Sequence, residues 1–294
     1  MIRDACTAAG KEYTIYCTKA RGDAAHYVRE MIADKPEDES YRFYACGGDG
    51  TLSEVVSGAV SASGDLAPMR GVEVGCIPIG TGNDFVRNFT NVPFFCDITK
   101  QILADSTNID VYRYDDGRYG INMANIGFDC DVVVKAAELK QKKLVPKKFA
   151  YIFGVISVLK KNLGRRIRVT FDDGRIEERE FQLVSAANGV WCGGGFHSAP
   201  RSSLSDGSID VSLIEKVTRR DFLRLVGSYK KGTHLETKLG SRVVRYTKNR
   251  SVTFDFDEPT NVCVDGEVEK RTSLTLTVAP QALSFVIPIG CDMI

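Results

Sequence analysis

Residues 41–51 read YRFYACGGDGT, an apolar stretch that runs directly into glycines and an aspartate. Tyr41 to Cys46 has the composition of a strand, and Leu52 to Ala62 has apolar residues at helical spacing. Glycines between a strand and a helix let a phosphate approach the backbone, and the free N–H groups at the helix N-terminus attract it. The stretch therefore predicts a phosphate-binding loop made of Gly47, Gly48, Asp49, Gly50 and Thr51.

The same stretch also has an ordinary structural explanation. Thr51 and Glu54 have the spacing of a capping box, in which two side chains satisfy N–H groups at the start of a helix. A single glycine loop fits that explanation about as well as it fits a nucleotide site. In the nucleotide interpretation Glu54 belongs to the site, and Asp49 is placed to meet a cation or a hydroxyl group.

A second glycine loop favours the nucleotide interpretation. Residues 78–84 read PIGTGND and join a predicted strand, Glu73 to Ile79, to a short helix that opens at Asp84. Loops that follow adjacent parallel strands meet at the same edge of the sheet, where open α/β sheets bind ligands. Asn83 or Asp84 alone would serve as a helix N-cap. The predicted nucleotide-binding residues of this loop are Gly80, Thr81, Gly82, Asn83 and Asp84.

The pattern of predicted strands and helices changes near residue 108. Before it, predicted strands (13–17, 41–46, 73–79) alternate with predicted helices (23–33, 52–62), which indicates a parallel sheet with crossover helices. After it, Asp-Gly pairs at 116, 173 and 206 separate alternating strands, as in antiparallel hairpins, with helices at 131–143, 147–161 and 219–231. We expect an α/β nucleotide-binding domain at 1–108 and a β-rich domain at 109–279, with residues 280–294 packing back on the first.

The composition is that of an ordinary globular protein. With 43% hydrophobic residues, 26% charged residues and a net charge of +1, it argues against a nucleic-acid-binding protein. Nine scattered cysteines without a C-x-x-C pair predict a reduced, cytoplasmic protein. The apolar run from Phe149 to Leu159 is shorter than the roughly 20 residues that a membrane-spanning helix needs. A lipid substrate would therefore be reached from the aqueous side.

One segment is strongly basic. Lysines and arginines at 140, 142, 143, 147, 148, 160, 161, 165, 166 and 168 flank an apolar stretch that contains no acidic residue. Such a helix can lie on an anionic membrane surface, which would give peripheral contact at the inner face of the membrane. A core helix with solvated ends is the alternative, and both hold if only the lysine-rich flanks meet lipid.

The later motifs occur in a characteristic order: Asn122 to Gly127, Asn188, the triple glycine 193–195, Ala199-Pro200, the segment 206–210 (DGSID) and Val264-Asp265-Gly266-Glu267. Together with the two loops, this set resembles the diacylglycerol kinase and sphingosine kinase superfamily, which shares G-G-D-G-T with NAD kinase. The resemblance covers residues 10 to 290 or so and is greatest to soluble bacterial lipid kinases. It implies ATP and Mg²⁺ as cofactors and transfer of the γ-phosphate to a lipid hydroxyl, with diacylglycerol, which would give phosphatidic acid, as the first expectation.

The resemblance also implies roles for individual carboxylates. Glu267 resembles the general base of the family's D-G-E motif, whereas its spacing alone favours a solvated turn residue. In some relatives Asp49 has the role of the base, so the division between Asp49 and Glu267 stays open. Asp84 resembles a metal and phosphate carboxylate. Asp206 and Asp210 resemble a pair that holds a structural Mg²⁺, with a simple hairpin turn as the alternative.

The chain departs from the family at its start. The family begins with a strand that carries Asn-Pro-x-x-Gly, and this chain begins within what would be the following helix. This leaves one flank of the parallel sheet exposed and full activity in question.

The sequence leaves two rival functions open: an NAD kinase-like enzyme, whose characteristic Asn-Glu is absent here, and a non-catalytic nucleotide- or lipid-binding protein. Diacylglycerol, phosphatidylglycerol, a sphingoid base and an isoprenoid alcohol all fit as acceptors, and the sequence also allows a homodimer.

Overall fold

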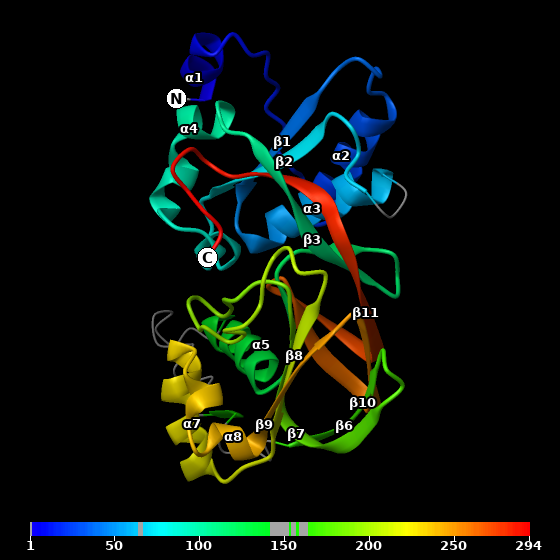
Figure 1. Ribbon diagram of the computed structural model, residues 1–294, viewed down its shortest axis with the longest axis vertical. Helices are drawn as coiled ribbons and strands as arrows, with labels where there is room; N and C mark the ends of the chain where they lie inside the picture. Colours follow the sequence, from blue (N-terminus) through cyan, green and yellow to red (C-terminus); the bar gives the residue numbers. More distant parts are fainter. Residues whose placement is uncertain (1, 64–66, 142–152, 154–156, 159–163) are drawn as a thin grey trace.

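The computed structural model describes residues 2–63, 67–141, 153, 157–158 and 164–294. Figure 1 shows two lobes stacked along the long axis of the molecule. The predicted helix 147–161 lies outside the described residues except for Phe153, Ser157 and Val158, and the lysines of the basic segment at 142, 143, 147, 148, 160 and 161 lie outside them too. Among the described residues, no helix is long and apolar enough to cross a membrane.

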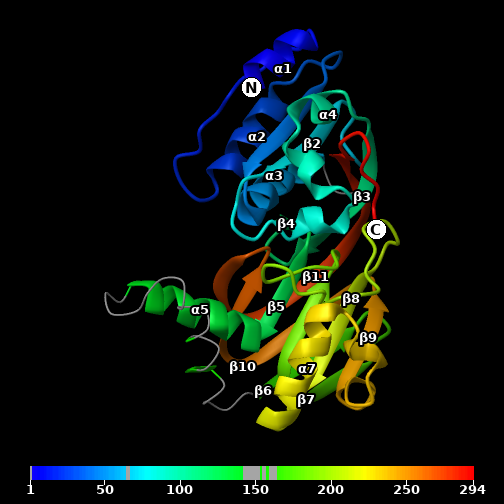
Figure 2. The same cartoon turned by 90° about the vertical axis from the view of Figure 1, so that its left-hand side faces the viewer.

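The N-terminal lobe contains α1 (Ile2–Ala8), α2 (Asp23–Ala33), β1 (Tyr41–Gly47), α3 (Asp49–Ala62), β2 (Val72–Pro78), the 3₁₀ helices η1 (Phe85–Asn88) and η2 (Val92–Cys96), and α4 (Ile98–Ile102). Strands β1 and β2 pair in parallel from Tyr41–Val72 to Gly47–Pro78. Helix α3 packs on both strands, and α2 packs on α3 (Figure 2). Because β1 and β2 end side by side, the two glycine loops that follow them emerge at one edge of the sheet, as the sequence predicted.

The predicted strand at Tyr13–Cys17 is wrong. Residues 11–19 have no regular secondary structure and are exposed. The physical reason is the lack of a neighbour, because an isolated strand cannot satisfy its own backbone hydrogen-bonding groups. Strand β1 lies at the end of the sheet, and β2 is its one neighbour among the described strands.

The C-terminal lobe is built from β4 (Tyr119–Gly120), β5 (Met123–Gly127), α5 (Phe128–Gln141), β6 (Arg165–Phe171), β7 (Ile176–Ala187), β8 (Ile209–Glu215), α7 (Arg219–Lys231), η4 (His234–Glu236), α8 (Gly240–Val243), β9 (Val244–Asn249) and β10 (Ser251–Val264). The hairpin turn at Asp173-Gly174 is confirmed between β6 and β7. Helix α7 begins after Thr218, whose hydroxyl accepts a hydrogen bond from the N–H of Asp221.

Asp206-Gly207 does not form a hairpin turn between adjacent strands. It lies in the long loop between β7 and β8, where the N–H of Gly207 donates to the carboxylate of Asp110 at 2.6 Å. An Asp-Gly pair can turn the chain in a tight hairpin or within a longer loop. Here the hydrogen bond to Asp110 favours the longer loop. The other pair, Asp116-Gly117, does connect antiparallel strands, because β4 pairs with β3 (Ser106–Tyr114).

Two strands are shared between the lobes. The long strand β11 (Glu267–Val286) pairs with β10 and with β3 in antiparallel fashion. Near its C-terminal end, Phe285 pairs in parallel with Val74 of β2. The C-terminal tail then returns to the N-terminal lobe, where the N–H of Ile294 donates to the carbonyl of Asn88. The lobes are therefore joined through one continuous sheet, in which β11, the red strand of Figure 1, runs from one lobe to the other.

An aromatic cluster buries the helix that follows the second glycine loop. Phe85, Phe89, Phe95 and Phe285 are each at most 1% exposed, and the rings of Phe85 and Phe285 lie 5.2 Å apart. Burying such a side chain stabilises the fold by about 1.5–3 kcal/mol. The cluster thus anchors η1 and, through it, the position of the second loop.

Candidate active site

The two glycine loops touch through their backbones. A Cβ atom added to Gly48 would lie 3.3 Å from the Cα of Gly80, and one added to Gly80 would collide with the Cα of Gly48. The carbonyl of Gly47 accepts hydrogen bonds from the N–H groups of Ile79 (3.0 Å) and Gly80 (3.2 Å). Side chains at Gly48 and Gly80 would push the loops apart, so glycine is required for this close approach.

Asp49 is the first residue of α3 and links the loops. Its Oδ1 accepts a hydrogen bond from the N–H of Phe85 at 3.1 Å, and a Cβ on Gly82 would lie 3.0 Å from its Oδ2. The N-cap residue of α3, Gly48, makes no side-chain capping hydrogen bond. Thr51 packs against Gly47, where it leaves no space for a side chain. The first turn of α3 therefore faces the loops with main-chain N–H groups.

The structure corrects the prediction for Glu54. Its carboxylate accepts hydrogen bonds from the N–H groups of Gly22 (2.7 Å) and Ala24 (3.2 Å), at the start of α2. Residue 54 lies more than one turn along α3, on the side that packs against α2, so its side chain points away from the loops. Glu54 forms neither the capping box with Thr51 nor a part of the phosphate loop; it caps a neighbouring helix.

The second loop is tied to the C-terminal lobe through Asp84. Asn83 closes the loop from a left-handed conformation (φ 52°), and its Nδ2 donates to the carbonyls of Pro78 and Gly80; Thr81 is exposed. Asp84 is 7% exposed, and its Oδ2 accepts a hydrogen bond from the N–H of Gly194 at 2.8 Å. Burial raises the pKa of Asp84, which the N–H groups of the triple-glycine loop oppose.

Glu267 comes from the other lobe and reaches the same place. It is the first residue of β11, and a Cβ on Gly50 would lie 3.6 Å from its Oε1. Its carboxylate forms an ion pair with Arg21. Glu267 therefore reaches from the C-terminal lobe to the first turn of α3, the turn that begins with the other candidate for the general base, Asp49.

Asp265 is a residue whose role sequence reasoning missed. It is 3% exposed, and its carboxylate accepts five hydrogen bonds of 2.9–3.0 Å, from the hydroxyls of Ser53 and Tyr112 and from the N–H groups of Ile121, Asn122 and Met123. Burial raises its pKa, and these donors oppose the rise. Asp265 joins α3, β3 and the start of β5 to the turn that carries Glu267, so it positions Glu267 from within the protein.

Asp206 and Asp210 are brought together, as the resemblance implied. Between them lies the ammonium group of Lys248, 2.5 Å from Asp206 Oδ2 and 3.1 Å from Asp210 Oδ2. This ammonium supplies the positive charge that the predicted Mg²⁺ would bring. In the described part of the chain, no group of three or more histidine, cysteine and carboxylate side chains is arranged to hold a metal ion. Asp84 is not a member of this pair; its contacts are with Gly194 and Arg87.

Asp129 is a second residue that sequence reasoning did not single out. It lies in the first turn of α5, and burial raises its pKa to about 7. Its charge adds to the effect of burial in raising the pKa of the thiols of Cys192 and Cys263. Asp129 follows β5 almost directly in the chain, and α5 packs against β5, β7 and β10. A carboxylate that titrates near neutral pH in such a place is a candidate functional residue.

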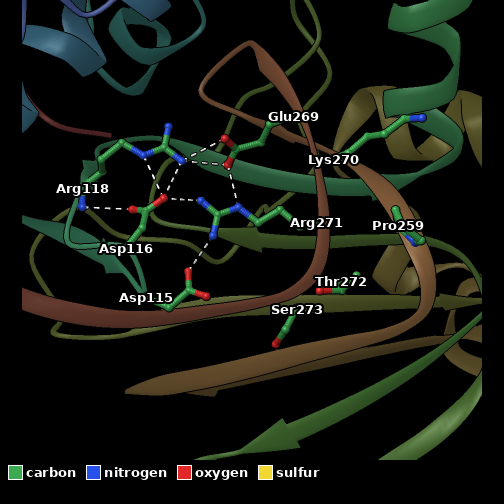
Figure 3. Close-up of a pocket in the computed structure, with 9 residues that line it drawn as sticks. All are labelled: Asp115, Asp116, Arg118, Pro259, Glu269, Lys270, Arg271, Thr272 and Ser273. Atoms are coloured by element: carbon green, nitrogen blue, oxygen red, sulfur yellow. Dashed lines mark hydrogen bonds and ion pairs between the residues drawn. The ribbon is translucent and has the colours of Figure 1, made fainter.

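A surface cavity of about 630 Å³ lies along β11 beyond Glu267 (Figure 3). Its lining is an ion-pair network rather than an apolar pocket. Arg118 pairs with Asp116 (2.7 Å) and Glu269 (2.9 Å), while Arg271 pairs with Asp115 (2.8 Å) and Glu269 (2.8 Å). Arg118 and Arg271 lower the pKa of Asp116 to about 2 against the opposing effect of burial. The network ties the β3–β4 hairpin to β11 and so braces the strand that begins with Glu267.

Comparison with known proteins decides the family. Residues 1–114 match the diacylglycerol kinase catalytic domain, and residues 122–287 match the YegS C-terminal NAD kinase beta sandwich-like domain. The chain belongs to the diacylglycerol kinase family. This membership places it among the lipid kinases, which are phosphotransferases with an alcohol group as acceptor.

Individual relatives agree with this membership. A protein of Bacillus subtilis named diacylglycerol kinase is 31% identical over 268 residues, which cover 88% of this chain and 80% of that protein. A Yersinia enterocolitica protein named "Probable lipid kinase YegS-like" is 25% identical, with 94% and 88% covered. A solved structure of a diacylglycerol kinase from Bacillus anthracis superposes with a TM-score of 0.65 at 20% identity, covering 98% of this chain and 92% of that one. At that identity the likeness concerns the fold alone.

Proposed function

We propose that this chain transfers the γ-phosphate of ATP, with Mg²⁺, to the hydroxyl of a lipid, and that diacylglycerol is the acceptor and phosphatidic acid the product. The observation that carries the proposal is that Glu267 lies beside Gly50, the residue after Asp49 in the first turn of α3. One carboxylate follows the glycine loop and the other comes from the opposite lobe. A donor phosphate on the loop and a hydroxyl beside Glu267 would then be neighbours.

The residues present fit a polyphosphate. The two loops present bare backbone at Gly48 and Gly80, where a side chain would push them apart, and the start of α3 offers main-chain N–H groups. Asp49 and Asp84 would hold Mg²⁺, because carboxylate oxygens suit that ion and the buried Oδ1 of Asp84 accepts no hydrogen bond, its one charged neighbour among the described residues being Arg87 at 3.4 Å. Bound there, the ion would neutralise charge on the transferring phosphate.

In the proposed reaction Glu267 acts on the acceptor. Its carboxylate takes the proton from the lipid hydroxyl as the hydroxyl oxygen forms a bond to the γ-phosphorus. The bond between that phosphorus and the bridging oxygen of the β-phosphate breaks, and ADP leaves with the electron pair. A carboxylate within hydrogen-bond reach speeds such a transfer by roughly 10²–10⁴. Asp265 holds the turn so that Glu267 keeps its place.

The acceptor side of the site is proposed to include Asp129. It lies in the first turn of α5, and its pKa near neutrality suits a group that binds an acceptor hydroxyl. We propose that the lipid is taken from a membrane surface. The basic residues 140–168 would contribute to that contact, and most of them lie outside the described residues.

The experiment is a phosphorylation assay with labelled ATP and Mg²⁺ in detergent micelles. The panel holds diacylglycerol, phosphatidylglycerol, a sphingoid base and an isoprenoid alcohol, with NAD as a water-soluble acceptor. We expect labelled phosphatidic acid, and none with the Asp49→Ala variant. Phosphorylation of NAD but of no lipid would instead support the NAD kinase-like alternative. ATP binding without turnover of any acceptor would support a non-catalytic binding protein.

A further inference from the structure

Arg21 lies in the segment before α2, and its guanidinium pairs with Glu267. The side chains are 57% and 32% exposed, and exposed ion pairs of this kind contribute little to the stability of a fold. Within the described part of the chain, the guanidinium of Arg21 has no other hydrogen bond or ion pair. Stability therefore does not account for an arginine placed on the candidate base.

Helix α3 positions both partners through consecutive residues. Glu54 binds the N–H of Gly22, the residue after Arg21, and Ser53 binds Asp265, two residues before Glu267. The segments that carry Arg21 and Glu267 are thus both bound to α3, and Glu267 lies beside Gly50 in its first turn. Helix α3, which also carries Asp49, thus holds in place the two segments from which Arg21 and Glu267 contact each other.

The segment that carries Arg21 is itself held in shape. The carboxylate of Asp23 accepts hydrogen bonds from the N–H of Lys19 (2.7 Å) and from the hydroxyl of Tyr16 (3.0 Å). The ring of Tyr16 stacks on Tyr27 of α2 at 3.9 Å. These contacts fix the backbone before α2 and leave the long side chain of Arg21 free to change partner.

We propose that Arg21 is a further phosphate-binding residue that controls Glu267. Without nucleotide its guanidinium holds the Glu267 carboxylate; with nucleotide it moves to the γ-phosphate and leaves Glu267 free to accept the proton. The inference rests on the function proposed above. A phosphate at the start of α3 carries more charge than one carboxylate and presents oxygens that guanidinium binds in bidentate fashion, so it is the stronger partner.

The first test measures binding of Mg²⁺-ATP and Mg²⁺-ADP by isothermal titration calorimetry, without any lipid. Arg21→Gln is expected to weaken ATP binding by roughly 10- to 100-fold, the range for one charge-assisted contact, and ADP binding by less than about threefold. Arg21→Lys should retain part of the ATP affinity. The matched control is Arg179→Gln, because Arg179 and Glu215 form a similarly exposed pair (51% and 29%) on β7 and β8. Thermal unfolding confirms that each variant is folded.

The second test uses Glu267→Gln. Removing the carboxylate frees Arg21 before nucleotide arrives, so ATP should bind about two- to fivefold more tightly, as expected for loss of an exposed ion pair. In the Arg21→Gln background the same substitution should change nothing. A merely structural Arg21 would not produce this dependence.

Three results would each overturn the proposal: equal losses for ATP and ADP, no loss for either, or the same effect of Glu267→Gln with and without Arg21. Because the titrations need no acceptor, they stand apart from the test of function. A protein that binds ATP through Arg21 and phosphorylates no lipid would refute the proposed function alone. A lipid kinase whose ATP affinity ignores Arg21 would refute this inference alone.

Discussion

Replacing Asp265 with asparagine removes a buried charge that five donors share. The carboxamide oxygen can still accept from Tyr112, Asn122 and Met123, but the amide nitrogen then faces the N–H of Ile121 and the hydroxyl of Ser53. The serine hydroxyl can rotate, whereas the N–H of Ile121 cannot. An orphaned buried donor costs about 1–3 kcal/mol, and each hydrogen bond to a charged group contributes about 1.5–3 kcal/mol. We expect Asp265→Asn to lower the free energy of unfolding by about 3–5 kcal/mol.

The assay is urea unfolding followed by far-ultraviolet circular dichroism, with kcat measured in parallel. Tyr112→Phe removes a single donor and leaves the carboxylate in place, so it should cost about 1.5–3 kcal/mol. Asp173→Asn is the matched surface control, because Asp173 accepts one N–H and forms one exposed ion pair, both with Arg175, and it should cost under about 0.5 kcal/mol. An Asp265→Asn variant no less stable than Tyr112→Phe would refute the account of Asp265 as a shared acceptor. We also expect kcat to fall, since Glu267 directly follows the turn that Asp265 holds.

Three further substitutions test the site. Asp49→Ala should reduce turnover by at least about 10²-fold and lower unfolding free energy by no more than about 1 kcal/mol, since it loses one hydrogen bond to Phe85; near wild-type turnover in the micelle assay would contradict the assignment. Glu267→Gln should lower kcat by roughly 10²–10⁴ without weakening nucleotide binding, and a kcat within a few-fold of wild type would assign the base to Asp49. For Asp129, the pKa raised to about 7 means that the folded protein holds the proton more tightly than the unfolded chain, so its stability contribution is lost as pH rises toward 7. The melting temperature of Asp129→Asn relative to wild type should therefore increase between about pH 4 and pH 7 and then level off, and a difference independent of pH would show that the carboxyl is not buried.

The glycine loops show what local sequence can determine. A strand that ends in glycines and an aspartate before a helix has few conformations open to it, so the loops at Gly47 and Gly80 followed from residues close in the chain. Their parallel pairing followed from the alternation of strands and helices. Helix α7 was predictable for the same reason, because its N-cap and its spacing of apolar residues are local signals. The order of the later motifs was enough to indicate the family.

Other features depended on contacts between distant residues. Tyr13–Cys17 has the composition of a strand, but no described strand lies beside it, and Glu54 has the spacing of a capping box and binds another helix. Asp265 and Ser53 are 212 residues apart, a separation that no local sequence pattern spans. Their hydrogen bond places Glu267 over α3. The sequence by itself determined which residue types form the loops and the family to which they belong. The tertiary structure alone decided which carboxylates meet, because a side chain takes its partner from whatever packing brings within hydrogen-bond distance, and spacing along the chain does not specify that partner.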